Sequence, residues 1–479
     1  MNSTTPQPAM VRVAFALPTA AALWLLIAPL YRIGLWLELP NEGWNATHAL
    51  NAFGGNLYPA PGSFIINNYP PLWFYLTGGL ARLGADPIFA GRIIAFLSFV
   101  ATAGAIFAIL RGLEASRGAA LAGALCFVLI VAGLLDSYVG LSEPQMLAHA
   151  LVAFGAAVLV RADNAKMASA AAVLTVIGMF TKQVVIALPL ASLIWLLIYR
   201  RKLVLPWLIA GAIAGFAALA AWLSLHANVI GNMLFPRVFA LSTLGKNLAL
   251  ISKAAVPLVV FAAVAWRRRA ARDEAMTFAG LAIVAGLAAL LIFGGARGVS
   301  INVVFDLVIA ASIGLGLVWD RLDALSPRAN VWRVVIAAAV LIRVGIGVPY
   351  ANVALAVDVR ERARLQQQSS TLSALSSRLK QVKGPVACET LSACVWAGHR
   401  NEVDLWKLHF ETTLGPFMDT RALLQGIADR RYGAVVLYGD SKPVLDRQLP
   451  GLAGALAAGY AGPQVIGGTT SLFLSRNSR

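Results

Sequence analysis

Long apolar runs separated by short polar tracts dominate the first three quarters of the chain. The runs that are long enough, or nearly long enough, to cross a bilayer lie at residues 13–35, 87–110, 118–135, 144–160, 167–180, 184–199, 203–225, 248–266, 275–294, 302–319 and 334–356. This pattern predicts an α-helical polytopic membrane protein with about eleven transmembrane helices. The two runs beside "FTKQVV" are short, so they form either two spans or one span and a broken or re-entrant segment.

The pattern changes after residue 356. "RERARLQQQSSTLSALSSRLKQ" has the pattern of a polar helix, "GPVACET" and "YGAVVLYG" are typical of strands, and "TRALLQGIADRR" is typical of a helix. "PQVIGGTTSLFLSR" indicates two strands joined at Gly467 and Gly468. We therefore predict a transmembrane domain over residues 1–356, followed by a small α/β domain over residues 357–479 outside the membrane.

The positions of Lys and Arg predict an orientation. The chain is 59% hydrophobic and 13% charged, with a formal net charge of +17. The cations lie mostly in short tracts between apolar runs, which indicates topology determinants and argues against a nucleic-acid partner. With the N-terminus in the cytoplasm, about fifteen cations fall in inner loops and about five in outer loops. The C-terminal domain is then extracytoplasmic.

The three cysteines are too few for a disulfide framework. Cys126 lies in an apolar run and is interpreted as a packing residue. Cys388 and Cys394 lie close together in the C-terminal domain, and a bridge between them is left open because it depends on an oxidising compartment.

The first outer loop, residues 36–86, is longer than a connector requires. In "NEGWNATHALNAF" the spacing predicts an amphipathic helix on the membrane surface, with Asn41, Asn45 and His48 on one face. Glu42 occupies its first turn, where a carboxylate either stabilises the helix or has a chemical role.

Two further acids, Asp136 and Glu143, lie in the outer loop "LDSYVGLSEPQ". Lys182 and Arg297 have the opposite charge and lie at a similar depth. Lys182 could equally be a cation at a helix end, and Arg297 a residue of a Gly-rich turn. Acids beside cations at one membrane face suit acid–base chemistry on a hydroxyl next to an anionic leaving group.

Three polar residues lie within apolar runs. Asn302 and Asp306 are spaced i and i+4 near the outer end of their span, which predicts substrate contact. Arg92 is expected to pair internally or with a phosphate. No histidine spacing indicates a zinc site.

Several segments resemble the polytopic glycosyltransferases of the GT-C type, which include protein mannosyltransferases and aminoarabinose transferases. They are "NEGWNATHA", "NNYPPLWFYL", "GRIIAFLS", "LSEPQMLAHALVAFGAAVLV", "GMFTKQVVIALPLA", "GVSINVVFDLVIAAS" and "GPVACETLSACVWAGHRNEVDLW". The resemblance implies a GT-C-like fold in a bacterial cytoplasmic (inner) membrane. It also implies transfer of a sugar from a polyprenyl-phosphate donor to a lipid, glycan or protein acceptor. Some relatives bind a divalent metal.

The resemblance also implies site residues. We expect Glu42 and Glu143 to be catalytic and the following residues to bind the donor or other substrates: Asn41, His48, Tyr69, Arg92, Asp136, Lys182, Gln183, Arg297, Asn302 and Asp306. The acceptor hydroxyl would lose its proton to Glu42 or Glu143, and Lys182 and Arg297 would hold the leaving phosphate.

One position departs from the family pattern. Where relatives carry Asp-Glu in the first outer loop, this chain has Asn41-Glu42. An amide is not a useful proton acceptor at neutral pH. Either Glu42 takes the role, with help from His48, or the activity has been lost or changed. A transporter or lipid flippase, and an inactive scaffold of envelope assembly, are the alternative functions.

Overall fold

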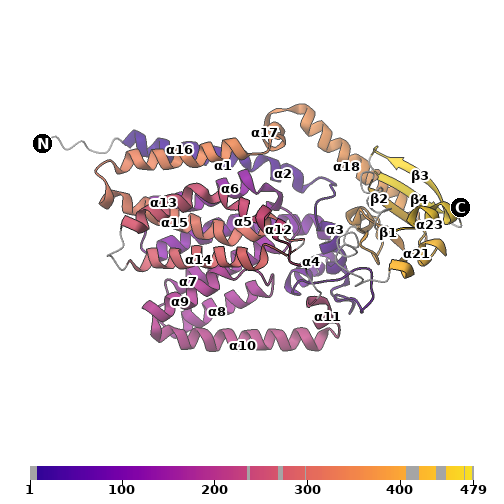
Figure 1. Ribbon diagram of the computed structural model, residues 1–479, viewed down its shortest axis with the longest axis horizontal. Coiled ribbons are helices and arrows are strands. Elements are labelled where there is room, and N and C mark those ends of the chain that lie inside the picture. The colour runs from indigo at the N-terminus through magenta and orange to yellow at the C-terminus, as the bar shows by residue number, and fades with distance from the viewer. Residues whose placement is uncertain are drawn as a thin grey trace.

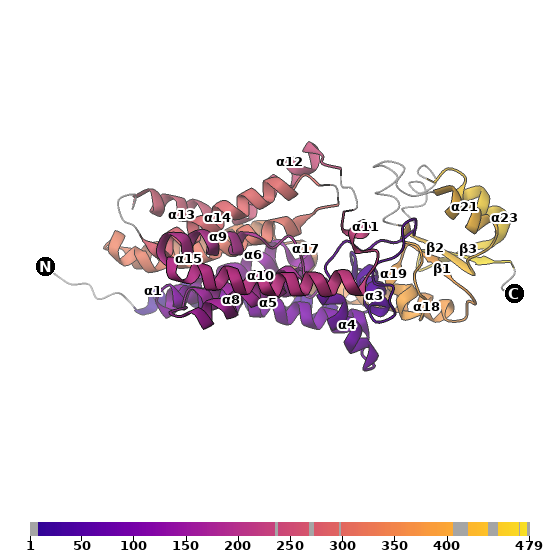
Figure 2. The same ribbon diagram turned by 90° about the horizontal axis from the view of Figure 1, so that it is seen from below.

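The chain folds into a long bundle of apolar helices with a smaller α/β domain at the end away from the N-terminus (Figure 1). The computed structural model describes residues 8–234, 238–267, 273–296, 298–405, 420–438, 449–468 and 470–476. The view at 90° shows the same order along the long axis (Figure 2). The fold is thus mainly helical with a small C-terminal sheet, as predicted.

The bundle is built from helices that run along its length. They are α1 (Pro8–Leu25), α2 (Ile27–Ile33), α5 (Pro87–Gly112), α6 (Arg117–Leu134), α7 (Gln145–Leu159), α8 (Ala165–Met179), α9 (Ala187–Tyr199), α10 (Arg201–Leu225), α13 (Ala255–Arg267), α14 (Glu274–Phe293), α15 (Phe305–Leu325) and α16 (Ala329–Gly347). Within the described residues, eight helical segments are long and apolar enough to cross a membrane, and α7, α8 and α9 are shorter apolar helices. The short pair α8 and α9 is broken at "FTKQVV", as the sequence allowed.

Polar side chains fix where several of these helices begin. Asp86 accepts hydrogen bonds from the backbone N–H groups of Ile88 and Phe89, both at 2.9 Å, and Pro87 opens α5. Ser116, Asn164 and Asp273 cap α6, α8 and α14 in the same way. Each cap satisfies backbone donors that the apolar helix itself leaves unpaired.

Burial differs sharply between helices of the bundle. The segment that includes α15, Ile301–Leu325, has 83% of its most apolar window buried inside the protein, whereas the window in α10 is 0% buried. Both are strongly apolar, so the difference reflects position: α15 packs at the centre and α10 presents its side chains outward. An apolar helix with no protein cover fits a lipid-facing surface.

The loops predicted to be outer loops gather at the end of the bundle that carries the C-terminal domain (Figure 1). Their short helices, and those that link the bundle to the C-terminal domain, are α3 (Glu42–Asn51), α4 (Leu72–Arg82), η1 (Asp136–Tyr138), α11 (Val229–Met233), α12 (Leu241–Ala249), η2 (Leu250–Ala254), η3 (Ile301–Val304) and α17 (Tyr350–Val357).

The interpretation of α3 as a helix lying on the membrane surface is wrong. Its polar residues Asn45 and His48 are 1% and 0% exposed, because α4 packs on one side of α3 and the C-terminal domain on the other. The exposed apolar side chains Leu50 and Phe53 lie only at its end. The helix is therefore an internal element of the protein.

The C-terminal domain contains the helices and strands that the sequence predicted, together with two helices that it did not. Its elements are α18 (Val359–Leu379), β1 (Val386–Cys388), α19 (Leu391–Trp396), α21 (Thr420–Ala428), β2 (Ala434–Tyr438), α23 (Leu452–Gly459), β3 (Tyr460–Ile466) and β4 (Thr470–Ser475), of which α19 and α23 were not predicted. The strand order is β1-β2-β4-β3, with β1 and β2 parallel and the other pairs antiparallel. Alternate residues face opposite sides of the sheet. One face packs on α18 and α19, and the other packs on α21 and α23.

The first outer loop and the C-terminal domain share one hydrophobic core. Trp44 and Trp73 of the loop belong to the same buried cluster as Leu375, Val386 and Trp396 of the C-terminal domain. Trp36 stacks against Trp396, with ring centroids 4.6 Å apart. The two parts therefore form one packed unit above the bundle.

Candidate active site

Asn41 occupies a tight turn immediately before α3. Its backbone lies in the left-handed region with φ 65°, which Asn tolerates better than most residues with a side chain. The Asn41 side chain makes no capping hydrogen bond to α3, and the residue lines a cavity instead.

Glu42, the next residue, points into the protein and forms an ion pair with Arg92. Arg92 Nε lies 3.0 Å from both carboxylate oxygens of Glu42, and Nη2 lies 2.5 Å from Oε2. Both side chains are fully buried. Arg92 also donates to the backbone carbonyls of Arg32, Ile33, Leu35 and Leu37. The pair therefore fastens the chain between α2 and α3 to α5.

The Glu42 carboxylate also connects the first outer loop to the next one. It accepts a hydrogen bond from the backbone N–H of Ser142 at 2.8 Å. Asn45 donates to the carbonyl of the same residue at 3.0 Å. Glu42 thus has partners on both sides, and this environment favours a positioning role over that of a free base.

Glu143 and Lys182 form a second buried ion pair next to the first. The Lys182 ammonium contacts Glu143 Oε1 and lies 4.4 Å from the centre of the Tyr69 ring. The Lys182 side chain is 3% exposed and that of Glu143 is 1% exposed. The other oxygen of Glu143 accepts from the backbone N–H of Gln145 at 2.8 Å. Three residues chosen from the sequence, Tyr69, Glu143 and Lys182, therefore meet in one cluster.

A chain of polar contacts continues from this cluster into the bundle. Asn302 Nδ2 lies 3.4 Å from Gln145 Oε1, Gln145 Nε2 lies 2.7 Å from His149 Nε2, and His149 Nδ1 lies 3.4 Å from Asp306. Asp306 accepts from the backbone N–H groups that begin α9, those of Ile186 and Ala187. Asn302 and Asp306 thus belong to one network, and Asp306 acts in it as a helix cap.

His149 and Gln145 were missed by sequence reasoning. Gln145 and His149 are spaced i and i+4 in "LSEPQMLAHA", so both fall on one face of α7. The i, i+4 spacing could have identified the two residues. It does not show, however, whether they join a polar network or are separate polar residues in a span.

The remaining predicted residues have separate surroundings. Asp136 does not join Glu143: it pairs with Arg32 at 3.0 Å, and Arg32 also donates to Asn352. Gln183 donates to the carbonyl of Asn68 at 2.9 Å. His48 Nε2 lies 3.1 Å from the carbonyl oxygen of Ile66, and its ring packs edge-on against Trp44. Arg297 lies outside the described residues.

A cavity of about 670 Å³ lies between the first outer loop, α17, α18 and the C-terminal sheet. Its walls include Glu38, Asn41 and Trp44 from the loop and Arg32 from α2. The C-terminal domain contributes Glu389 and Tyr438, among others. Glu38, which sequence reasoning did not select, opens onto this cavity three residues before Asn41.

Some relatives bind a divalent metal, and the sequence assigned no residue of this chain to one. In the part of the chain that the structure describes, no group of three or more His, Cys, Asp or Glu side chains is arranged to hold a metal ion. The structure therefore gives no residues to which a metal role can be assigned.

Comparisons with known proteins agree on the fold. Residues 68–225, which contain Tyr69, Glu143 and Lys182, match the model of the dolichyl-phosphate-mannose-protein mannosyltransferase family. The structure is similar to ArnT from Cupriavidus metallidurans bound to undecaprenyl phosphate, with a TM-score of 0.61, 14% identity and coverage of 98% of both chains. No curated protein sequence matches the chain.

A second similar structure is the archaeal oligosaccharyltransferase AglB from Archaeoglobus fulgidus in complex with an inhibitory peptide and a dolichol-phosphate. Its TM-score is 0.50 at 12% identity, and the match covers 97% of this chain and 74% of that chain. The fold is therefore similar to that of polytopic membrane glycosyltransferases of the GT-C type, and residues 68–225 match the model of one such family.

Proposed function

We propose that the protein transfers a sugar from a polyprenyl-phosphate donor to a hydroxyl group of an envelope lipid, polysaccharide or protein. The observation that carries this proposal is the cluster of Glu143, Lys182 and Tyr69. It lies at the end of an apolar bundle, beneath a folded domain, where a lipid tail can stay in the membrane while its head group meets polar residues.

The donor class follows from the chemistry of that cluster. A buried ammonium such as that of Lys182 is costly unless an anion accompanies it. A phosphate can take the place of Glu143 beside Lys182, and the carboxylate then moves away or takes up a proton. The similar structures support this class, because one is bound to undecaprenyl phosphate and another is in complex with a dolichol-phosphate.

The reaction is a single displacement at the anomeric carbon. The acceptor oxygen forms a bond to that carbon as the bond to the phosphate oxygen breaks, and the polyprenyl phosphate leaves with the electron pair. The acceptor proton passes to a carboxylate of the protein. This displacement inverts the anomeric configuration, and Lys182 stabilises the charge that develops on the phosphate.

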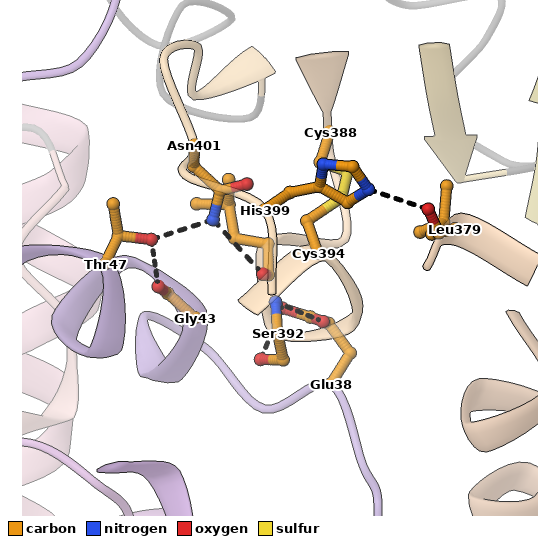
Figure 3. The surroundings of a disulfide bond; sticks show 10 residues. Glu38, Gly43, Thr47, Leu379, Cys388, Ser392, Cys394, His399 and Asn401 are labelled. Carbon is orange, nitrogen blue, oxygen red and sulfur yellow. Dashed lines mark hydrogen bonds between the residues drawn. A yellow bond between two sulfur atoms is a disulfide. The ribbon is translucent and has the colours of Figure 1, made fainter. Parts of the chain in front are cut away.

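The proposal also includes the membrane and the orientation of the protein in it. The outer loops and the C-terminal domain face the extracytoplasmic side of a bacterial cytoplasmic membrane, and the N-terminus lies in the cytoplasm. The disulfide between Cys388 and Cys394 supports this orientation, because such bonds persist in oxidising compartments (Figure 3).

A reconstituted assay tests the proposal. The purified protein in lipid nanodiscs would be mixed with an envelope extract and with undecaprenyl phosphate carrying radiolabelled mannose, glucose or arabinose, and the released undecaprenyl phosphate would be measured. We expect release with one of these donors, together with labelled acceptor, and loss of both in Lys182→Met. Absence of transfer from every donor would contradict the proposal.

A scaffold without activity is the second candidate, because Asn41 lacks the carboxylate expected at its position and Glu42 is held by Arg92. The same assay separates the two. A scaffold would bind undecaprenyl phosphate or envelope proteins without ever releasing sugar.

A further inference from the structure

Glu38 is a carboxylate of the first outer loop that faces the cavity beside Asn41. It lines the cavity wall together with Asn41, and its side chain is exposed there. Protein surrounds it on the other sides, with Ser392 of the C-terminal domain directly opposite (Figure 3). Residue 41 thus lacks the expected carboxylate, but Glu38 supplies one on the same cavity wall.

Ser392 holds the Glu38 carboxylate in a defined orientation. The backbone N–H of Ser392 lies 3.3 Å and 3.1 Å from its two oxygens, and the Ser392 hydroxyl lies 3.1 Å from Oε1. A carboxylate offers about four acceptor sites, so acceptor capacity remains for a group in the cavity. Gly43 permits this arrangement, because a methyl group there would overlap the Ser392 backbone.

Three other carboxylates of this region belong to ion pairs. Glu42 is held by Arg92 and Glu143 by Lys182. Glu361, on the cavity wall, pairs with Arg364 at 2.6 Å. Each of these three carboxylates is held by a cation of the protein. Glu38 is bound by neutral donors instead.

We propose that Glu38 is the proton acceptor for the acceptor hydroxyl, a role that rests on the proposed function. The hydroxyl proton passes to a Glu38 oxygen while the hydroxyl oxygen bonds to the anomeric carbon. The bond from that carbon to the phosphate breaks, and the lipid phosphate keeps the electron pair. Glu38 then releases its proton to water in the cavity, which restores the carboxylate.

The position of the donor cluster is consistent with this role. Trp44 lines the cavity and contacts Tyr69 edge-on, with ring centroids 5.1 Å apart, and Lys182 lies against the Tyr69 ring. A single displacement needs the proton acceptor and the leaving group on opposite faces of the sugar. The Trp44–Tyr69 ring pair thus connects the cavity that Glu38 lines to the Lys182 ammonium.

The surroundings of Glu38 tune its acidity. Desolvation raises the pKa of Glu38, and the hydrogen bonds from Ser392 oppose that rise. Glu42 behind the loop raises this pKa further, and Arg92 lowers it. The titratable and charged groups that line the cavity around it are Arg32, Glu361, Arg364, Glu389, Asp404 and Tyr438. The rate should therefore rise with pH as Glu38 loses its proton.

The test compares Glu38→Gln with Ser392→Ala and with Glu402→Gln, an exposed glutamate paired with Arg431 on the surface. The assay is the one described above, run over a range of pH values. The amide keeps the shape of the side chain and can still accept from Ser392. We expect Glu38→Gln to lower turnover by about 10²–10⁴-fold, with a melting temperature close to that of the wild type, and Glu402→Gln to match the wild type.

Ser392→Ala provides the second measurement, because it keeps the carboxylate and removes one hydrogen bond that lowers its pKa. We expect its rate profile to shift to higher pH. A purely structural Glu38 would produce no such shift, and its two variants would lose stability and activity together. Equal turnover in Glu38→Gln and wild type would overturn the role of Glu38 and leave the proposed function intact. A wild type that never transfers sugar would overturn both.

Discussion

Two buried ion pairs lie side by side at the outer end of the bundle, and they differ in how firmly each is held. Glu42–Arg92 includes an arginine that also binds four backbone carbonyls, so it is part of the framework. Glu143–Lys182 joins a single point charge to a carboxylate and an aromatic ring. Lysine can exchange one anion for another without dismantling a loop. A carboxylate found by sequence can therefore be structural or chemical, depending on the partner that the fold gives it.

Removing the arginine should produce the largest effect on folding. Arg92→Met leaves Glu42 buried without a cation and four carbonyls without their donor. We expect a loss of about 3–5 kcal/mol of stability, visible as a much lower melting temperature in detergent. Arg82→Ala is the control, because Arg82 is exposed and makes one long hydrogen bond to Phe53. Similar melting temperatures for Arg92→Met and Arg82→Ala would show that the Glu42–Arg92 pair is not part of the structural framework.

Removing the lysine should affect chemistry as well as folding, because it leaves the buried Glu143 without its cation. We expect Lys182→Met to reduce turnover by about 10²–10³-fold, the range for loss of one electrostatic contact to a developing charge. Binding of undecaprenyl phosphate, measured by titration in nanodiscs, should weaken in parallel. If Lys182→Met bound the lipid phosphate as well as the wild type does, Lys182 would be a structural residue like Arg92.

A smaller change reaches both pairs through Ser142, which lies between them. Gly91 of α5 approaches Ser142 so closely that a methyl group would overlap its side chain. Gly91→Ala should therefore cost about 1–3 kcal/mol through overpacking, and it should slow transfer by displacing Glu143. Gly104→Ala on the same helix has open space and serves as the control. Unchanged stability and turnover in Gly91→Ala would show that the loop containing Ser142 can shift to accommodate the added methyl group.

The smallest effect on stability is expected at Asn302. Its hydrogen bond to Gln145 is long, at 3.4 Å, so Asn302→Ala should change stability by no more than about 0.5–1.5 kcal/mol. A decrease in turnover at constant melting temperature would indicate contact with substrate. Unaltered turnover would place Asn302 outside the site.

Local patterns in the sequence were sufficient to predict most of the helices and strands of this protein. Most apolar runs correspond to helices of the bundle, although the run at 334–356 is divided into α16 and α17 at Pro349. The predicted C-terminal strands and helices lie where period and turn residues indicated, and α19 and α23 were not predicted. This success has a physical basis, because helix and strand formation depend on neighbours within a few residues. The presence of polar side chains near the outer ends of the spans, among them Lys182 and Asp306, was also evident from sequence.

Only the tertiary structure decided the partners of these side chains. Glu42 and Arg92 are 50 residues apart, and Glu143 and Lys182 are 39 residues apart. No local period encodes such pairings. They arise because helix packing brings α3 against α5 and the loop before α7 against the break between α8 and α9. The same packing buried α3 on both sides and left Glu38 open to the cavity. The sequence by itself thus determined the helices, the strands and the supply of charged groups, whereas the packing of distant segments determined which charges neutralise one another and which remain available for chemistry.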